Sequence, residues 1–154
     1  MRRESPSIGA VLLLLIPLGF AGAAQNETNP PWNAPEAARQ VKNPVKPTKE
    51  GLAASAKLFR ENCMTCHGES GAGDGPVADS LMRHPANFTD KKMMSEATDG
   101  ELFWKITTGR GPMPSWQDQL SETERWQLVN YLRMLTEKAA DDKVDKKEGQ
   151  EKPQ

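Results

Sequence analysis

The chain contains few cysteines and histidines, the residues that form disulfides and closed zinc sites. Among its 154 residues there are two cysteines and two histidines. A closed zinc site takes four ligands, and only His84 lies away from the segment Cys63–His67 that holds the others. No pattern of β-strands surrounds the cysteines, although a thioredoxin-like redox pair lies in a βαβ context. The composition therefore disfavours both kinds of site and leaves a disulfide between the cysteines as an open alternative.

The chain also lacks a large excess of charge of either sign. It has 20 basic and 21 acidic residues. Removing residues 1–24 takes away two arginines and one glutamate, which leaves 18 basic and 20 acidic residues and a net charge of −2. A nucleic-acid-binding surface is strongly basic, and a near-neutral protein exerts no strong steering field on a partner. We therefore expect no nucleic-acid partner.

Long apolar runs are absent as well. The run from Ile8 to Phe20 would span roughly 20 Å as a helix, against about 30 Å for the hydrocarbon core of a bilayer. Arg2 and Arg3 precede it, and the small residues Ala21–Ala24 follow it. This arrangement predicts a signal peptide over residues 1–24 and export to the periplasm of a bacterium. Membrane contact is expected only if the segment stays uncleaved.

The two cysteines lie in the sequence Cys63-Met64-Thr65-Cys66-His67. This is the C-x-x-C-H pattern at which haem c is attached. Two thiols that are one helical turn apart can add to the two vinyl groups of one haem, and the following imidazole can bind its iron. The motif therefore predicts one covalently attached haem c, held by Cys63 and Cys66, with His67 as the proximal iron ligand.

The composition divides the chain into four parts. Residues 25–47 contain five prolines and no periodic apolar face, which is typical of a linker. Trp32 is the one large apolar residue in this linker. It could dock on the folded domain, but we expect it to be loosely placed. Residues 48–135 form the predicted domain. Residues 136–154 are charged and lack core-forming side chains, which predicts disorder or a frayed helical extension.

Three stretches of the domain have apolar residues at helical spacing behind a capping residue. They run from Thr48 to about Asn62, from Thr98 to Gly109, and from Ser121 to about Leu135. In the second and third, a glutamate follows the cap by three residues, as in a capping box. The segment between His67 and Asp90 is rich in glycine, proline and aspartate and is predicted to be a long loop. The fold class is therefore all-α.

Met113 is the best candidate for a second iron ligand. It lies between the second and third predicted helices and has Pro112 and Pro114 on either side. Proline restricts the backbone, and a stiff loop can hold a thioether against iron although that bond is weak. His84 is the competing candidate, but a lone histidine in a long loop is more often a surface residue.

These motifs together resemble those of a known family, the class I (mitochondrial-type) monohaem cytochromes c, and in particular its exported bacterial members. The similar segments are Cys63–Gly68, Gly71–Pro76, Glu101–Trp104, Gly109–Trp116 with Met113, and Leu128–Leu132. The resemblance covers about Thr48 to Leu135. It implies the class I cytochrome c fold, with about three main helices, some short ones, and long loops wrapped around one covalent haem.

The resemblance also implies specific contacts. The first and last helices should cross, with Ser55 or Ala56 against Tyr131 and Phe59 alongside. A loop carbonyl should accept a hydrogen bond from the ring of His67, and Pro76 is the natural candidate for that carbonyl. Apolar residues should form the wall of the haem pocket, namely Phe88, Phe103, Trp104, Ile106 and Trp116.

The function expected from these features is one-electron transfer between two redox proteins, a donor and an acceptor. Ligation of iron by His67 and Met113 would leave no open coordination site, so the protein is expected to be a carrier and not an enzyme. One alternative is a haem sensor or peroxidase-like subunit with an open distal site, near Arg110 or His84. Another is a cytochrome subunit fixed to a larger oxidoreductase, which would differ in its partner and not in its site chemistry.

Overall fold

The structure, a computed structural model, describes the backbone of residues 31–150 and the side chains of residues 31–142. The predicted signal peptide, residues 1–24, lies outside the described residues. The described helices belong to one unit, Trp32–Gln154. Within this part of the chain there are six α-helices and one 3₁₀ helix, and the only β-type pairing is an isolated bridge between Arg110 and Met113. The all-α prediction is confirmed.

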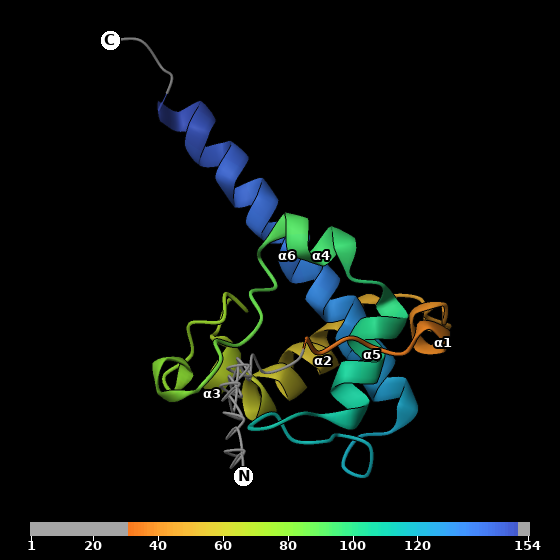
Figure 1. Cartoon of the computed structure of the whole chain (residues 1–154). Coiled ribbons are helices and arrows are strands. Elements are labelled where there is room, and N and C mark those ends of the chain that lie inside the picture. Colours follow the sequence, from red (N-terminus) through yellow and green to blue (C-terminus); the bar gives the residue numbers. More distant parts are fainter. Residues whose placement is uncertain (1–30, 151–154) are drawn as a thin grey trace, which may run out of the picture. The chain divides into compact units, whose positions relative to one another are not determined.

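Three helices are much longer than the rest, as predicted. They are α2 (Lys49–Asn62), α5 (Asp99–Thr108) and α6 (Glu122–Gln150). Figure 1 shows α2 and α5 lying against the first half of α6. The short helices are α1 (Glu36–Arg39), α3 (Met64–His67), η1 (Ala78–Ser80) and α4 (Lys91–Glu96).

The main helices begin at the predicted caps. Thr48 Oγ1 accepts a hydrogen bond from the Gly51 N–H at the start of α2, over 3.0 Å. Ser121 and Glu124 form a complete capping box at the start of α6, in which the carboxylate accepts from the Ser121 N–H over 2.8 Å. These bonds satisfy backbone donors that the first turn of a helix leaves unpaired.

The capping box predicted at α5 is only half formed. Thr98 Oγ1 accepts from the Glu101 N–H over 3.1 Å. The Glu101 carboxylate does not turn back to the cap, because it pairs with Lys105 at 2.7 Å and with Arg39 at 3.2 Å. Glu101 is 7 % exposed, and a buried carboxylate needs such cationic partners more than it needs a backbone N–H.

The core lies where α2 crosses α6. Ser55 is fully buried at this crossing, and the rings of Phe59 and Tyr131 lie 5.4 Å apart. This is the helix crossing that the resemblance implied. Around it, α6 contributes a continuous apolar face, consisting of Trp126, Leu128, Val129, Leu132 and Leu135. Burial of that face is the main source of stability for a domain of this size.

From Trp32 onward, the predicted linker is part of the folded domain. Trp32 lies 6.2 Å from the ring of Trp104, so the expectation of a loosely placed tryptophan was wrong. Asn43 donates to Asn130 of α6 over 2.9 Å. The backbone of α1 approaches Gly100 so closely that a Cβ atom there would lie 2.0 Å from the Ala38 carbonyl oxygen. Backbone contact at a glycine and side-chain hydrogen bonds hold this arm, although it has no periodic apolar face.

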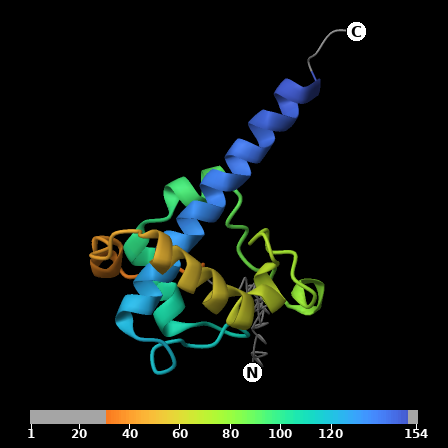
Figure 2. The ribbon, with the colours of Figure 1, turned by 180° about the vertical axis from the view of Figure 1, so that it is seen from behind.

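The helix α6 continues through the predicted tail as far as Gln150. Figures 1 and 2 both show its second half extending away from the other helices. Of the two expectations for this segment, disorder or a helical extension, the structure has the helical form over residues 136–150. No helix in the described part of the chain is both long enough and apolar enough to cross a membrane.

Candidate functional site

The predicted attachment motif lies at the junction of two helices. Cys63 ends α2 as its C-cap and begins α3, and its carbonyl accepts hydrogen bonds from the Cys66 N–H at 3.2 Å and the His67 N–H at 2.9 Å. The three side chains are therefore presented by a single helical turn, as the spacing predicted. All three are half-buried, and both thiols are free. Burial, together with the nearby thiol of Cys66, raises the pKa of Cys63 to about 11.

A hydrogen bond holds one edge of the His67 ring. Its Nδ1 lies 3.2 Å from the carbonyl oxygen of Ala86. A carbonyl can only accept, so Nδ1 carries the proton and Nε2 keeps a free lone pair. Among the described residues no other group forms a hydrogen bond with this ring. Burial lowers the pKa of His67, which favours the neutral form that binds metals, although the bond to Ala86 opposes this shift.

The carbonyl that orients His67 was predicted wrongly. Ala86 occupies the role that was assigned to Pro76, ten residues earlier in the same loop. The loop between His67 and Asp90 contains no regular strand or long helix from which a register could be counted. Which of its carbonyls reaches the imidazole is decided by how the loop folds back, and no sequence signal specified that.

The first part of this loop lies against the attachment motif. Backbone N–H groups of Gly73 and Gly75 donate to the carbonyls of His67 and Cys66, over 2.8 and 3.1 Å. At Gly75 a Cβ atom would lie 2.4 Å from the Thr65 carbonyl oxygen, so only glycine fits. The absence of a side chain at these glycines therefore allows the loop backbone to approach the backbone of the motif closely.

Met113 lies in a tight turn between α5 and α6. Its N–H and C=O both pair with the backbone of Arg110, at 3.2 and 2.9 Å. Gly111 has a φ of 60°, as the first central residue of a type II′ turn requires, and Pro112 follows it. The Met113 side chain is half-buried and packs against the hydrophobic core.

Hydrogen bonds also link the residues that follow Met113 to α5. Ser115 Oγ donates to the Thr107 carbonyl over 2.7 Å, and the Trp116 N–H donates to the Ile106 carbonyl over 3.2 Å. A Cβ atom at Gly109 would lie 2.4 Å from the Pro114 backbone. The segment is therefore stiffened by these contacts as well as by its prolines. Figures 1 and 2 show it running from the end of α5 past the C-terminal end of α2, where α3 begins.

Four of the five predicted wall residues belong to the core or pack on it. Phe88, Ile106 and Trp116 are buried, and Phe103 stacks on Trp126 with the ring centroids 3.9 Å apart. Trp104 is different, because it faces the N-terminal arm. Two free thiols, an imidazole with an available Nε2 and a thioether on a stiff turn are the groups that attach haem c and bind its iron. The apolar side chains named above are of the kind that lines a haem pocket.

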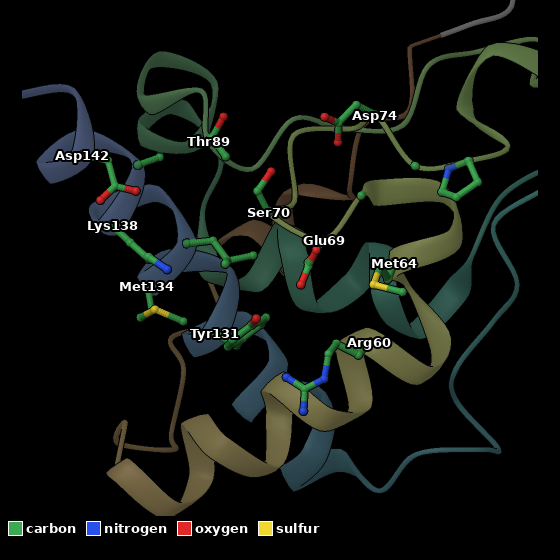
Figure 3. A pocket seen from close by; sticks show the side chains of 15 residues that line it. Arg60, Met64, Glu69, Ser70, Asp74, Thr89, Tyr131, Met134, Lys138 and Asp142 are labelled. Carbon is green, nitrogen blue, oxygen red and sulfur yellow. The ribbon is translucent and has the colours of Figure 1, made fainter. Parts of the chain in front are cut away.

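Two cavities near the motif do not include the predicted ligands. A cavity of about 790 Å³ lies between the glycine-rich loop and α6, with Met64, Glu69, Tyr131 and Lys138 among its lining residues. Figure 3 shows these side chains. None of Cys63, Cys66, His67 and Met113 lines it. A smaller one of about 290 Å³ is lined by Asp79 and His84 among others. The side chain of His84 is 71 % exposed and lies 3.6 Å from Asp79, as expected for a surface residue.

Residues 50–132 match the family described as cytochrome c oxidase, cbb3-type, subunit III. Over 92 residues the chain is 36 % identical to the cbb3-type cytochrome c oxidase subunit FixP of Bradyrhizobium sp. (strain ORS 278). That alignment covers 58 % of this chain and 30 % of the relative. Cytochrome c6 of Cladophora glomerata is 30 % identical over 83 residues, which cover 54 % of this chain and 87 % of the relative.

A solved structure is similar too. It is a chain of the Kuenenia stuttgartiensis reducing HAO-like protein complex Kustc0457/Kustc0458, with 32 % sequence identity and a TM-score of 0.53. The likeness covers 62 % of this chain and 49 % of the other. This chain therefore spans less than a third of the FixP relative and about half of the solved chain, but most of the cytochrome c6.

Proposed function

Because this chain belongs to the cytochrome c family, which the match over residues 50–132 and the likeness to cytochrome c6 establish, we propose that it transfers single electrons between redox proteins. The domain is one that carries covalently attached haem c. When bound, the haem supplies an iron that alternates between the ferrous and ferric states. The protein supplies its attachment, its axial ligands and the environment that sets its potential.

The observation that carries this proposal is the geometry of the attachment turn. Cys63 and Cys66 provide the two thiols from one helical turn, and His67 follows with its Nδ1 engaged by Ala86. Engagement of Nδ1 directs Nε2 to the metal and raises the basicity of the ligand. We assign Cys63 and Cys66 to haem attachment and His67 to proximal ligation of the iron.

Met113 is proposed as the sixth ligand. Its turn is closed by two backbone hydrogen bonds to Arg110 and is tied to α5 by Ser115 and Trp116. A weak thioether bond benefits from such a stiff loop, because little conformational entropy is then lost on ligation. Methionine ligation raises the reduction potential relative to bis-histidine ligation. It also closes the iron to small molecules, which favours a carrier over a sensor or peroxidase.

We also propose export to the periplasm, on the basis of the signal peptide predicted over residues 1–24. The redox partners are either freely diffusing proteins or the other subunits of a fixed complex. The names of two relatives favour the second possibility, since FixP is described as an oxidase subunit and the solved chain belongs to a protein complex. A fixed cytochrome subunit of a larger oxidoreductase is therefore the second candidate, with the same haem chemistry.

The proposal is tested by absorption spectra of the purified holoprotein. With Met113 bound, the ferric protein should be low-spin and show a weak sulfur-to-iron charge-transfer band at the red end of the spectrum. Met113→Ala should abolish that band, lower the reduction potential, and allow cyanide or carbon monoxide to bind. His84→Ala is the matched control, because His84 lies on the surface beside Asp79. It should leave the band and the potential unchanged.

Two results would contradict the assignment. If His84→Ala disturbs the iron and Met113→Ala does not, the ligation is bis-histidine. If the unmodified protein is high-spin and binds carbon monoxide readily, the iron has an open site and the sensor or peroxidase class is correct. Fractionation with mass spectrometry tests export: a mature chain that begins near Gln25 in the periplasmic fraction supports it, and an intact Met1 in membranes contradicts cleavage.

A further inference from the structure

Phe88 lies flat on the ring of His67. The two ring centroids are 4.7 Å apart and the planes are inclined by 23°. Phe88 is 7 % exposed, and its own ring meets Phe59 edge-on at 6.4 Å. Phe59 is further from His67, at 6.5 Å, and is tilted by 49°. Phe88 therefore stacks on one face of the imidazole, and Phe88 itself packs against Phe59 in the core.

The bond to Ala86 does not by itself fix the plane of the imidazole. The ring turns about its Cβ–Cγ bond, and a single hydrogen bond at Nδ1 restrains that rotation at one edge of the ring only. A stacked ring removes that rotation, since turning the imidazole would drive it into the face of its neighbour. Ala86 and Phe88 therefore restrain different motions of the same side chain, and they are two residues apart in one loop.

Phe88 is in turn held from two directions. Its N–H donates to the Gly71 carbonyl over 2.7 Å, and its carbonyl accepts from Thr136 Oγ1 over 2.8 Å. Gly71 has a φ of 78°, and a Cβ atom there would lie 2.8 Å from the Leu135 side chain and 3.4 Å from the Phe88 ring. The glycine-rich loop and α6 thus clamp the backbone of Phe88 between them.

We propose that Phe88 is a positioning residue that sets the rotation of the proximal imidazole about its bond to the haem iron, and that Thr136 secures it from α6. The inference rests on the proposed function in one respect, that His67 ligates the iron. Orientation of the imidazole plane determines how its π-orbitals overlap with those of the metal, and so the electronic anisotropy of the ferric state. Through Thr136, the last helix therefore helps to set the properties of the haem.

The test compares substitutions that remove or keep the flat aromatic contact at position 88. Phe88→Leu keeps a buried apolar side chain and removes the aromatic face, whereas Phe88→Tyr keeps the face. Phe59→Leu is the matched control, since Phe59 is also buried and aromatic but meets Phe88 only edge-on and is not stacked on His67. The readouts on the ferric holoprotein are the g values of its electron paramagnetic resonance spectrum and the spread of the haem-methyl proton resonances.

We expect Phe88→Leu to shift the largest g value and to change the methyl spread, and Phe88→Tyr to restore both toward the unmodified protein. Phe59→Leu should lower the thermal unfolding midpoint and leave the spectra close to those of the unmodified protein. Thr136→Val, which removes the hydroxyl at nearly constant size, should give a smaller shift in the same direction as Phe88→Leu. Thr89→Val is its control, because that hydroxyl donates to the neighbouring Asn87 side chain over 2.6 Å, and it should be silent.

The inference is overturned if Phe88→Leu lowers stability but leaves the g values and methyl shifts unchanged, because Phe88 is then ordinary core packing. It is also overturned if Phe59→Leu shifts the spectra as much as Phe88→Leu does. A failure of the proposed function looks different. In that case the unmodified protein itself lacks the spectrum of an imidazole-ligated haem c, before any variant is compared.

Discussion

The loop of residues 68–90 and the three main helices are stabilised in different ways. The helices bury a continuous apolar cluster, to which α6 alone contributes Trp126, Leu128, Val129, Leu132 and Leu135. The loop contributes one described residue, Phe88, to that cluster. Its other buried positions are Gly68, Gly71, Gly73, Gly75 and Ala78, which have little or no side chain to bury. The loop is therefore organised by backbone contacts with the attachment motif, and the helices by the hydrophobic effect.

This difference indicates which part of the domain needs the haem most. A segment with few buried apolar contacts opens at low free energy, whereas a packed helical core opens only near global unfolding. The loop also supplies Ala86 and Phe88, the two residues that contact the His67 ring most closely. The region that is least able to fold on its own is thus the one that positions His67, the proposed iron ligand.

The largest expected effect comes from removing both attachment thiols. The Cys63→Ala, Cys66→Ala double variant should lose covalent haem and have a lower free energy of unfolding. So small a domain buries a modest core, and the covalently held haem is the cross-link that would compensate for it. Hydrogen exchange should then lose protection first across residues 68–90, with any remaining protection in α2, α5 and α6. Haem that survives denaturing gel electrophoresis, or exchange that accelerates equally in the loop and the helices, would contradict this.

The second expected effect compares one glycine from each region. At Gly75→Ala the new Cβ would lie 2.4 Å from the Thr65 carbonyl oxygen, which is backbone and cannot move aside. Overpacking of this kind costs about 1–3 kcal/mol, and the yield of attached haem should fall as well.

Gly51→Ala is the control within α2. Its Cβ would meet the flexible side chain of Gln127 and the capping hydroxyl of Thr48, each at 3.2 Å. Alanine favours a helix over glycine by about 1 kcal/mol. Its stability should lie within about 1 kcal/mol of the unmodified protein, by that balance of propensity and crowding. Denaturant unfolding of the two holoproteins measures the difference, and equal losses at the two glycines would remove the distinction between loop and helix.

The smallest expected effect concerns the helical region alone. Hydrogen bonds from Ser121 lower the pKa of Glu124 below its ordinary value. The carboxylate therefore adds stability above its unfolded pKa, and loses that contribution as the pH falls through the lowered pKa of the folded protein. At neutral pH, Glu124→Gln should cost at most about 1 kcal/mol, since the cap is at the surface and screened by solvent.

The difference between Glu124→Gln and the unmodified protein should shrink on acidification, which thermal unfolding at a series of pH values would show. Glu122→Gln is the control, because Glu122 lies in the same helical turn outside the capping box. A cost for Glu124→Gln that stays constant with pH would show that charge has no part in the cap.

Local features of the sequence predicted most of the helical scaffold. Thr48 and Ser121 cap helices where their positions indicated, because a capping hydroxyl acts on an N–H only three residues away. The contact between α2 and α6 followed from the resemblance and is present in the structure, with the rings of Phe59 and Tyr131 5.4 Å apart. Trp32 was placed wrongly, because its partner Trp104 is far away in sequence and no periodic pattern connects the two.

The sequence by itself determined which residues we propose to attach the haem and bind its iron. The order of Cys63, Cys66 and His67 within five residues is a covalent property of the chain, and one helical turn is enough to bring the three side chains together. The tertiary structure decided what surrounds them. Ala86 and Phe88 reach the His67 ring only because the glycine-rich loop folds back on the attachment motif and α6 holds its far side. Contacts of that kind depend on the path of an irregular backbone, and an irregular backbone has no period from which they could be read.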